Sequence, residues 1–149
     1  MNTNISALAV RPYELSDEEA VVALWNVAFP DPAPHNDPQT AIARKQEIQR
    51  ELFFVATIEE RLVGTALAGY DGHRGWVYSV AVDPECRRRG IGAMLMTRVE
   101  SELACIGCPK LNLQVLASNS EVVAFYHRLG YHVEERVSMG KLLTGKTDR

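Results

Sequence analysis

The chain reads VAVDPECRRRGIG over residues 80–92. Its first three residues continue an apolar run that predicts a strand, and Asp83-Pro84 ends that strand. After residue 90 the apolar residues recur four apart, which predicts a helix. The chain therefore passes from strand to helix across one basic, glycine-containing turn.

The turn carries the groups that bind a phosphate. The start of a helix leaves backbone N–H groups unpaired and carries a partial positive charge. Gly90 and Gly92 have no side chain, so an anion can approach the backbone closely. Arg87, Arg88 and Arg89 can add charge-assisted hydrogen bonds. We therefore expect a phosphate-binding turn, with a solvated basic turn as the alternative.

Two common phosphate-binding loops do not match this turn. The Walker pattern G-x-x-x-x-G-K-[ST] is absent, and so is the dinucleotide fingerprint G-x-G-x-x-G after a strand. What is present is Arg87-x-x-Gly90-x-Gly92, directly after a predicted strand. The sequence therefore does not indicate a P-loop nucleoside triphosphatase or a Rossmann-type dinucleotide-binding protein.

The rest of the chain alternates between strand and helix patterns. Strands are predicted over residues 7–11, 52–58, 61–70, 76–82, 111–116, 131–138 and 140–143. Helices are predicted from about residues 16 to 28, 37 to 50, 90 to 106 and 119 to 129. The order predicts an α/β protein of mixed α+β kind, with one mixed sheet between helices.

Composition limits the class of protein. The chain has 149 residues, of which 46% are hydrophobic and 23% charged, with a net charge of −3 and three cysteines. This length suits one domain over residues 1–149 with a full hydrophobic core. No apolar run approaches a membrane span, no signal peptide is evident, and an odd cysteine number suits a reducing compartment. We expect a cytoplasmic protein that binds neither membrane nor nucleic acid, because a basic footprint is lacking.

A second pattern follows the predicted strand 111–116. It reads N-x-x-V-x-x-F-Y-x-x-x-G-Y, from Asn119 through Val122 and Tyr126 to Tyr131. By helical spacing alone, Tyr126 fits a plain core position. A phenol with a pKa of about 10 also holds its proton at neutral pH and can donate it to a thiolate. The two interpretations are compatible, since a ring can pack while its hydroxyl faces a cleft.

Together the two patterns resemble the GNAT superfamily of acyl-CoA-dependent N-acetyltransferases. That family has [R/Q]-x-x-G-x-[G/A] after the corresponding strand, and N-x-x-A-x-x-F-Y-x-x-x-G-F downstream. Val122 replaces the family's usual alanine. Residues 36–38, 69–75, 107–110 and 138–141 further resemble a bacterial branch, the YpeA-like acetyltransferases. The resemblance covers nearly the whole chain and implies a single-domain GNAT fold, with a mostly antiparallel, twisted sheet flanked by about four helices.

The resemblance also implies a reaction and a site. The co-substrate is acetyl-CoA, and an amine on a small molecule or peptide attacks the thioester directly. Tyr126 matches the tyrosine that protonates the departing thiolate, and a backbone N–H near Val80 or Val82 is expected to hold the oxyanion. The expected cofactor-binding residues are Val80, Ala81, Val82, Arg87, Arg88, Arg89, Gly90, Ile91, Gly92 and Asn119, the last at the pantetheine arm.

Several points stay open at this stage. The general base is Tyr78, Asp71, His73 or water, and the acceptor amine is not indicated. Cys105 and Cys108 form a lone C-x-x-C at a helix end, which is weak evidence for a metal, and no metal site is expected. A symmetric homodimer is compatible with such a domain. The alternatives are a CoA-binding sensor without turnover, and a partner-binding or nucleic-acid-binding domain that uses the three arginines.

Overall fold

Five strands form one sheet in the order β1-β2-β3-β4-β5. In the computed structural model, which describes residues 7–144, the strands are β1 Leu8–Pro12, β2 Phe53–Ile58, β3 Arg61–Tyr70, β4 Gly75–Val82 and β5 Leu111–Asn112. The first four pair antiparallel in succession, and β5 joins β4 in parallel. The predicted mixed, mostly antiparallel sheet is confirmed.

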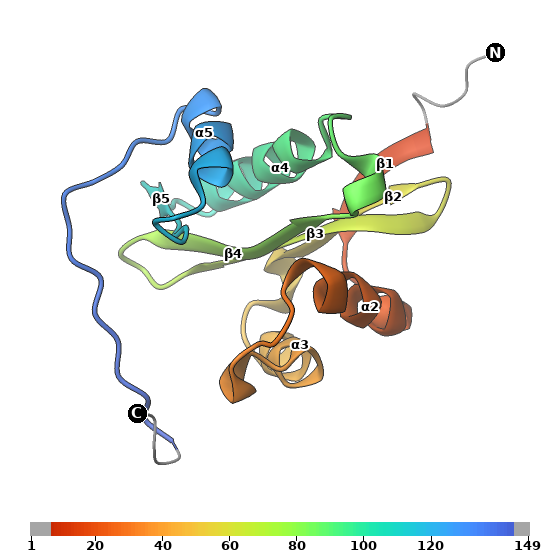
Figure 1. Ribbon diagram of the computed structural model, residues 1–149, viewed down its shortest axis with the longest axis horizontal. Coiled ribbons are helices and arrows are strands. Elements are labelled where there is room, and N and C mark those ends of the chain that lie inside the picture. Colours follow the sequence, from red (N-terminus) through yellow and green to blue (C-terminus); the bar gives the residue numbers. More distant parts are fainter. Residues whose placement is uncertain (1–6, 145–149) are drawn as a thin grey trace. The chain divides into compact units, whose positions relative to one another are not determined.

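The described residues also form helices. They are α2 Glu18–Ala28, α3 Pro38–Glu47, α4 Ile91–Cys105 and α5 Ser120–Arg128, with short 3₁₀ turns at Leu15–Asp17, Pro34–Asn36, Arg50–Leu52 and Pro84–Cys86. In Figure 1, α2 and α3 lie on one face and α4 on the other. Local chemistry sets the helix starts: at α3 the Asp37 carboxylate accepts the Thr40 N–H at 3.1 Å, and Pro38 takes the first helical position.

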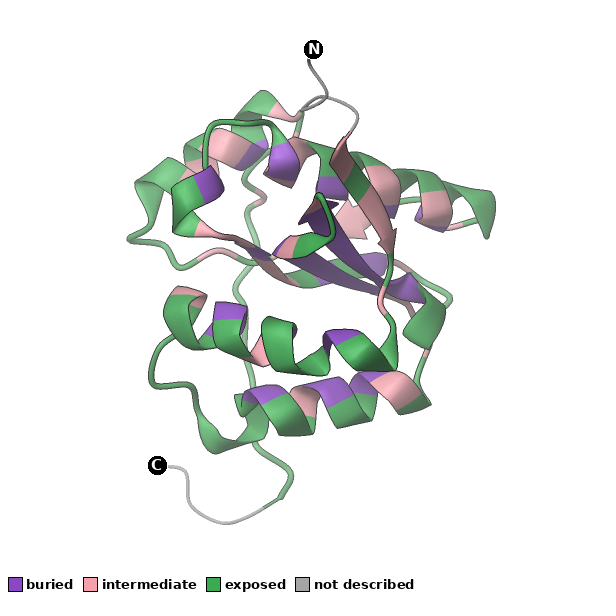
Figure 2. Cartoon of the chain, turned by 90° about the vertical axis from the view of Figure 1, so that its right-hand side faces the viewer, coloured by how far each residue is buried: buried purple, intermediate pink, exposed green. Residues whose placement is uncertain are grey.

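The core lies between these layers. Figure 2 shows the buried residues along the central strands and on the helix sides that face them. Toward α2 and α3, a buried cluster joins Val21, Leu24, Trp25, Ile42, Phe53, Val55, Leu67 and Ala81. Toward α4, the buried stripe is Ile91, Leu95, Met96, Val99 and Leu103, close to the four-residue spacing of the sequence. Burial of apolar surface on both faces is the main stabilising term for such a sheet.

The described residues form two compact units that divide after Gln114, and each is described by itself. The first contains the sheet with α2, α3 and α4, and the second contains α5. A single domain over residues 1–149 stays a prediction.

The predictions for the C-terminal strands are wrong. The strand predicted over 111–116 is only Leu111–Asn112, and no strand forms over 131–138 or 140–143. Val133, Val137 and Met139 are exposed by 82%, 86% and 89%. Alternating apolar and polar residues give an extended segment one apolar side. A strand also needs a neighbouring strand for its hydrogen bonds. Among the described residues of the second unit, α5 is the one regular element, so its own unit offers no such neighbour.

An ion pair ties β1 to the start of α2. Both terminal guanidinium nitrogens of Arg11 donate to the Asp17 carboxylate at 2.9 Å, and the Glu14 N–H donates to it at 2.8 Å. The hydrogen bond from Arg11 lowers the pKa of Asp17 below its ordinary value of 3.8. Because Asp17 is buried, this pair is held in one geometry, unlike most surface pairs.

We predict that Asp17→Asn lowers the free energy of unfolding at pH 7 by about 1–2 kcal/mol, since a charge-assisted bond is lost. A group with a lowered folded-state pKa stabilises above its unfolded pKa and stops doing so as the pH falls through its folded pKa. The deficit of the variant should therefore shrink below pH 3.8. Urea unfolding at several pH values measures it, and an equal deficit at every pH would contradict the assignment.

Candidate functional site

One side of β4 is open over most of its length. β4 pairs with β3 from end to end, but with β5 only at Gly75↔Leu111 and Trp76↔Asn112. In the described part of the first unit, no strand pairs with that side of β4 beyond Trp76. The two strands thus separate after two residue pairs, which leaves backbone groups of residues 77–82 along an edge where a ligand can lie.

β4 also contains a bulge. The register runs from Thr65↔Ala81 to Leu67↔Tyr78, so β4 uses one residue more than β3 over this step. Neither Ser79 nor Val80 has a register partner, and Ser79 has a left-handed φ of +52°. The predicted oxyanion position near Val80 therefore falls at this bulge.

The turn after β4 is held from inside the protein. The Asp83 N–H donates to the Val63 carbonyl at 2.8 Å, and the Asp83 carboxylate accepts the Glu85 N–H at 2.9 Å. Arg61 reaches the same carboxylate at 3.2 Å. These bonds fix the 3₁₀ turn Pro84–Cys86, after which the chain extends toward the basic residues.

The basic turn itself faces outward. Arg87, Arg88 and Arg89 are all exposed. Arg88 and Gly90 have left-handed φ angles of +68° and +77°. A Cβ at Gly90 would have no heavy atom within 4 Å, so the space beside this glycine is open. Exposed guanidinium groups around an open backbone are suited to an anion.

The first turn of α4 supplies backbone donors next to this space. The Met94 N–H is bonded to the Gly90 carbonyl, so by helix geometry the N–H groups before it have no intrahelical acceptor. The Ile91 side chain is buried and Gly92 is half-buried. The helix start lies close against β3, because a Cβ at Gly64 would meet Leu95 Cδ1 at 3.0 Å and Ile91 Cγ2 at 3.2 Å.

The predicted residues of the first unit differ in what they expose. Ala81 and Ile91 have buried side chains, so only their backbone groups are available at the site. Val80 and Val82 are half-buried on β4. The structure thus brings the end of β4, the arginine turn and the start of α4 together in one continuous segment, as the sequence predicts.

Asn119 and Tyr126 belong to the second unit. The Asn119 amide oxygen caps α5 by accepting the Val122 N–H at 3.2 Å. Tyr126 is buried, with Phe125 and Tyr131 rings at edge-on distances of 4.9 and 5.8 Å. Burial raises the pKa of Tyr126 to about 12, which keeps the phenol protonated at neutral pH. Both the core and the acid interpretations of this residue agree with these facts.

Two of the candidate bases are poorly suited to take a proton. Tyr78 is 46% exposed, and the partial burial of its ring raises its pKa, so this phenol stays protonated near neutrality. Backbone N–H groups of Arg74 and His73 donate to the Asp71 carboxylate at 2.8 Å and lower its pKa. Asp71 therefore shapes the turn between β3 and β4, and His73 is exposed in that turn.

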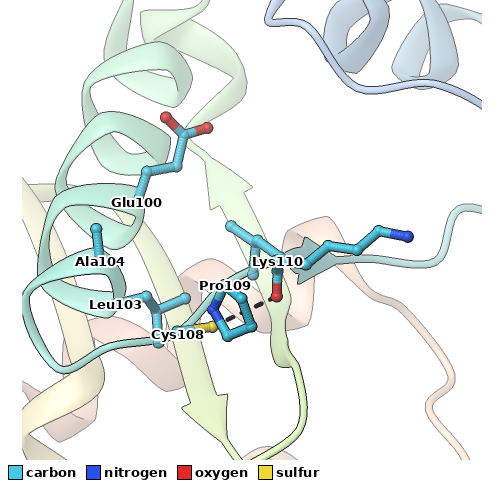
Figure 3. A pocket seen from close by; sticks show the side chains of 7 residues that line it. Glu100, Leu103, Ala104, Cys108, Pro109 and Lys110 are labelled. Carbon is cyan, nitrogen blue, oxygen red and sulfur yellow. Dashed lines mark hydrogen bonds between the residues drawn. The ribbon is translucent and has the colours of Figure 1, made fainter.

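A cavity of about 160 Å³ lies elsewhere in the first unit, at the C-terminal end of α4 (Figure 3). Glu100, Leu103 and Cys108 line it, together with Lys110. The Cys108 thiol contacts the Lys110 carbonyl at 3.4 Å, and Cys105 is exposed. The cavity shares no residue with the basic turn.

Two features are absent from residues 7–144. No three His, Cys, Asp or Glu side chains gather as a metal site within that range. No helix in the same range is long and apolar enough to cross a membrane.

Comparison with known proteins identifies the family. The model of the acetyltransferase (GNAT) family matches residues 18–131, which include the whole of the turn and Tyr126. The chain belongs to the GNAT acetyltransferase family. It is also 39% identical over 136 residues to Acetyltransferase YE1169 of Yersinia enterocolitica, covering 91% of this chain and 96% of that protein. Membership implies acyl transfer from acetyl-CoA.

Solved structures show the same GNAT fold. Ard1 from Thermoplasma volcanium superposes with a TM-score of 0.77 at 23% identity, over 86% of this chain and 84% of that one. The aminoglycoside N-acetyltransferase AAC(6')-Iy, in complex with CoA, gives 0.75 at 19% identity, over 92% and 95%. At these identities the likeness establishes the fold. The narrower resemblance to the YpeA-like branch stays a prediction.

We predict that Gly90→Ala lowers the free energy of unfolding by about 1–2 kcal/mol, because an L-residue is strained at a left-handed φ. Gly90→Asn should lose less, since asparagine tolerates this conformation. Gly140→Ala is the control, because Gly140 has open space and no left-handed φ. Equilibrium denaturation compares the three variants. Equal stability of Gly90→Ala and wild type would contradict the assigned turn geometry.

Proposed function

We propose that this protein transfers an acetyl group from acetyl-CoA to a primary amine, with the pyrophosphate of the cofactor bound at the turn between β4 and α4. The observation that carries the proposal is the open backbone at Gly90, beside three exposed arginines and the unpaired N–H groups of the first turn of α4. Oriented N–H groups and guanidinium groups together are a strong site for a diphosphate.

The residues of the turn fit this group in size as well as charge. A side chain at Gly90 would fill the open space next to the backbone, so its absence leaves room for phosphate oxygens. Positive charges at a helix N-terminus are unfavourable for the helix by about 0.3–1 kcal/mol each, and a bound anion relieves that cost. The charge of the turn therefore supports binding of an anionic ligand there.

Acetyl-CoA supplies the activated thioester, and the chain supplies three functions around it. The edge of β4 beyond Trp76 is available to hydrogen-bond the pantetheine arm, since β5 does not use it. A backbone N–H at the β4 bulge stabilises the oxyanion that forms as the amine attacks the carbonyl carbon. The hydroxyl of Tyr126 then gives its proton to the departing sulfur and regains a proton from solvent. The family resemblance assigns Asn119 to the pantetheine arm.

The attacking amine must lose a proton, and we assign its removal to water. Tyr78 stays protonated because burial raises its pKa, and Asp71 is a weak base because hydrogen bonds lower its pKa. His73, exposed in the β3–β4 turn, is the remaining side-chain candidate. The acceptor is a small-molecule or peptide amine, and a screen of amine classes can identify it.

We predict that wild-type protein releases CoA thiol from acetyl-CoA in the presence of one class of amine. The screen contains a polyamine, an amino acid, a lysine peptide, a peptide with a free N-terminus and an aminoglycoside. In Tyr126→Phe, kcat should fall by roughly 10²–10⁴-fold with little change in KM for acetyl-CoA, since only a proton donor is lost. Phe125→Leu is the control on the same helix. Acetyl-CoA binding without thiol release in any reaction would favour the CoA-binding sensor.

A further inference from the structure

A chain of two hydrogen bonds, the first buried and the second partly buried, leads from α2 to the bulge of β4. The indole N–H of Trp25, on α2, donates to the Thr65 hydroxyl at 2.9 Å. The Thr65 hydroxyl, on β3, lies 2.9 Å from the Ser79 carbonyl oxygen on β4. Thr65 is 0% and Trp25 is 3% exposed, so the bond between them is shielded from solvent, and the bond to Ser79 is partly buried. Three elements of the first unit are thus joined at one point.

The direction of each bond follows from the chemistry of the groups. An indole N–H can only donate, so Thr65 must accept from Trp25. The single hydroxyl hydrogen of Thr65 is then free to point at the Ser79 carbonyl, which can only accept. Trp25 therefore orients the hydroxyl, and the hydroxyl holds the carbonyl. We call Trp25, Thr65 and the Ser79 carbonyl the bulge relay.

Holding this carbonyl also fixes the next N–H. The Ser79 carbonyl and the Val80 N–H belong to the same planar peptide unit. No cis peptide bond occurs among the described residues, so the two groups point in opposite directions. Because the carbonyl points at Thr65, the Val80 N–H points away from it. That direction leads away from β3, the strand that carries Thr65 and pairs with β4.

This peptide unit needs outside support. Ser79 has a left-handed φ of +52°, which non-glycine residues seldom adopt. Neither Ser79 nor Val80 has a register partner on β3, so the regular ladder does not hold them. Such conformations persist when surrounding contacts determine them, and they concentrate at functional sites. The bulge carbonyl accepts a hydrogen bond from the Thr65 hydroxyl, which supplies such a contact.

We propose that Thr65 and Trp25 are positioning residues for acetyl transfer, because the bulge relay aims the Val80 N–H at the oxyanion of the thioester carbonyl. The proposal rests on the proposed function. It assigns the oxyanion donor to Val80, where the sequence alone leaves Val80 and Val82 as alternatives. Neither Thr65 nor Trp25 touches the substrate in this role, since both are buried.

The test compares single-turnover rates at saturating acetyl-CoA in four single variants and one double variant. Thr65→Val keeps the shape of the side chain and removes the hydroxyl, and Thr65→Ser restores it. Trp25→Phe keeps an aromatic ring and removes the donor. Thr57→Val is the matched control, because Thr57 is a buried threonine on β2, which does not pair with β4.

Thr65→Val is expected to lower the rate of the chemical step by roughly 10- to 100-fold, somewhat less than loss of an oxyanion donor itself. KM for acetyl-CoA should stay nearly unchanged, since the turn and the open edge are intact. Trp25→Phe should lower the same rate to a smaller extent, and Thr65→Ser should recover most of it. Thr65→Val combined with Trp25→Phe should cost no more than Thr65→Val alone, because both act through one hydroxyl.

A second readout separates this role from loss of stability. If Val80 N–H holds the thioester oxygen, its exchange with solvent should slow when acetyl-CoA binds, and the slowing should be weaker with CoA, which lacks the carbonyl. In Thr65→Val the difference between acetyl-CoA and CoA should disappear, while Thr57→Val keeps it. NMR-detected hydrogen exchange at Val80 measures this in the intact, folded protein.

The outcomes are distinguishable. An active wild type in which Thr65→Val and Thr57→Val have equal rates would overturn the relay and leave the proposed function standing. A rate loss in Thr65→Val that Thr65→Ser does not recover would also overturn it. A wild type that transfers no acetyl group to any amine would overturn the proposed function, and the catalytic role of the relay with it.

Discussion

A backbone N–H group can hold a ligand only if its own helix or sheet does not use it, and this constraint governs the first unit. The chain leaves such groups at two neighbouring places, the end of β4 and the first turn of α4. At β4 the second side of the strand is open beyond Trp76, and at α4 the donors before Met94 have no intrahelical acceptor. Backbone N–H groups without an acceptor in their own helix or sheet are not fixed by regular hydrogen bonds. Contacts from neighbouring elements must therefore fix their positions.

The packing around these places supplies that support. The start of α4 is pressed against β3 at Gly64, where a single methyl group would crowd Leu95 and Ile91. The Asp83 N–H is fastened to Val63, and the Ser79 carbonyl to Thr65. All three supports come from β3. This strand therefore holds in place the backbone groups of β4 and α4 that have no partner of their own. The ion pair between Arg61 and Asp83 is largely exposed and adds little stability by comparison.

The sequence predicts the strands and helices around the candidate site better than it predicts the backbone geometry within the site. The strand over 61–70, the helix from Ile91 and the glycine-containing turn before that helix follow from residue patterns, because each depends on local periodicity or on glycine. The bulge at Ser79 does not, because YSVAV reads as an uninterrupted strand and the supporting Thr65 and Trp25 are distant in sequence. The strands predicted over 131–143 do not form, for a related reason. Alternating apolar residues determine which side of a segment is apolar, but not which strand pairs with it.

The most direct measurement is a calorimetric titration of wild type and Gly92→Glu with acetyl-CoA, with ATP as a competing phosphate ligand. Glutamate suits the second position of a helix, so the variant should fold, while its carboxylate repels phosphate. Acetyl-CoA is expected to bind wild type in preference to ATP and to bind Gly92→Glu at least about tenfold more weakly. Equal affinity of the two proteins, or no binding by wild type, would contradict a phosphate site at the turn between β4 and α4.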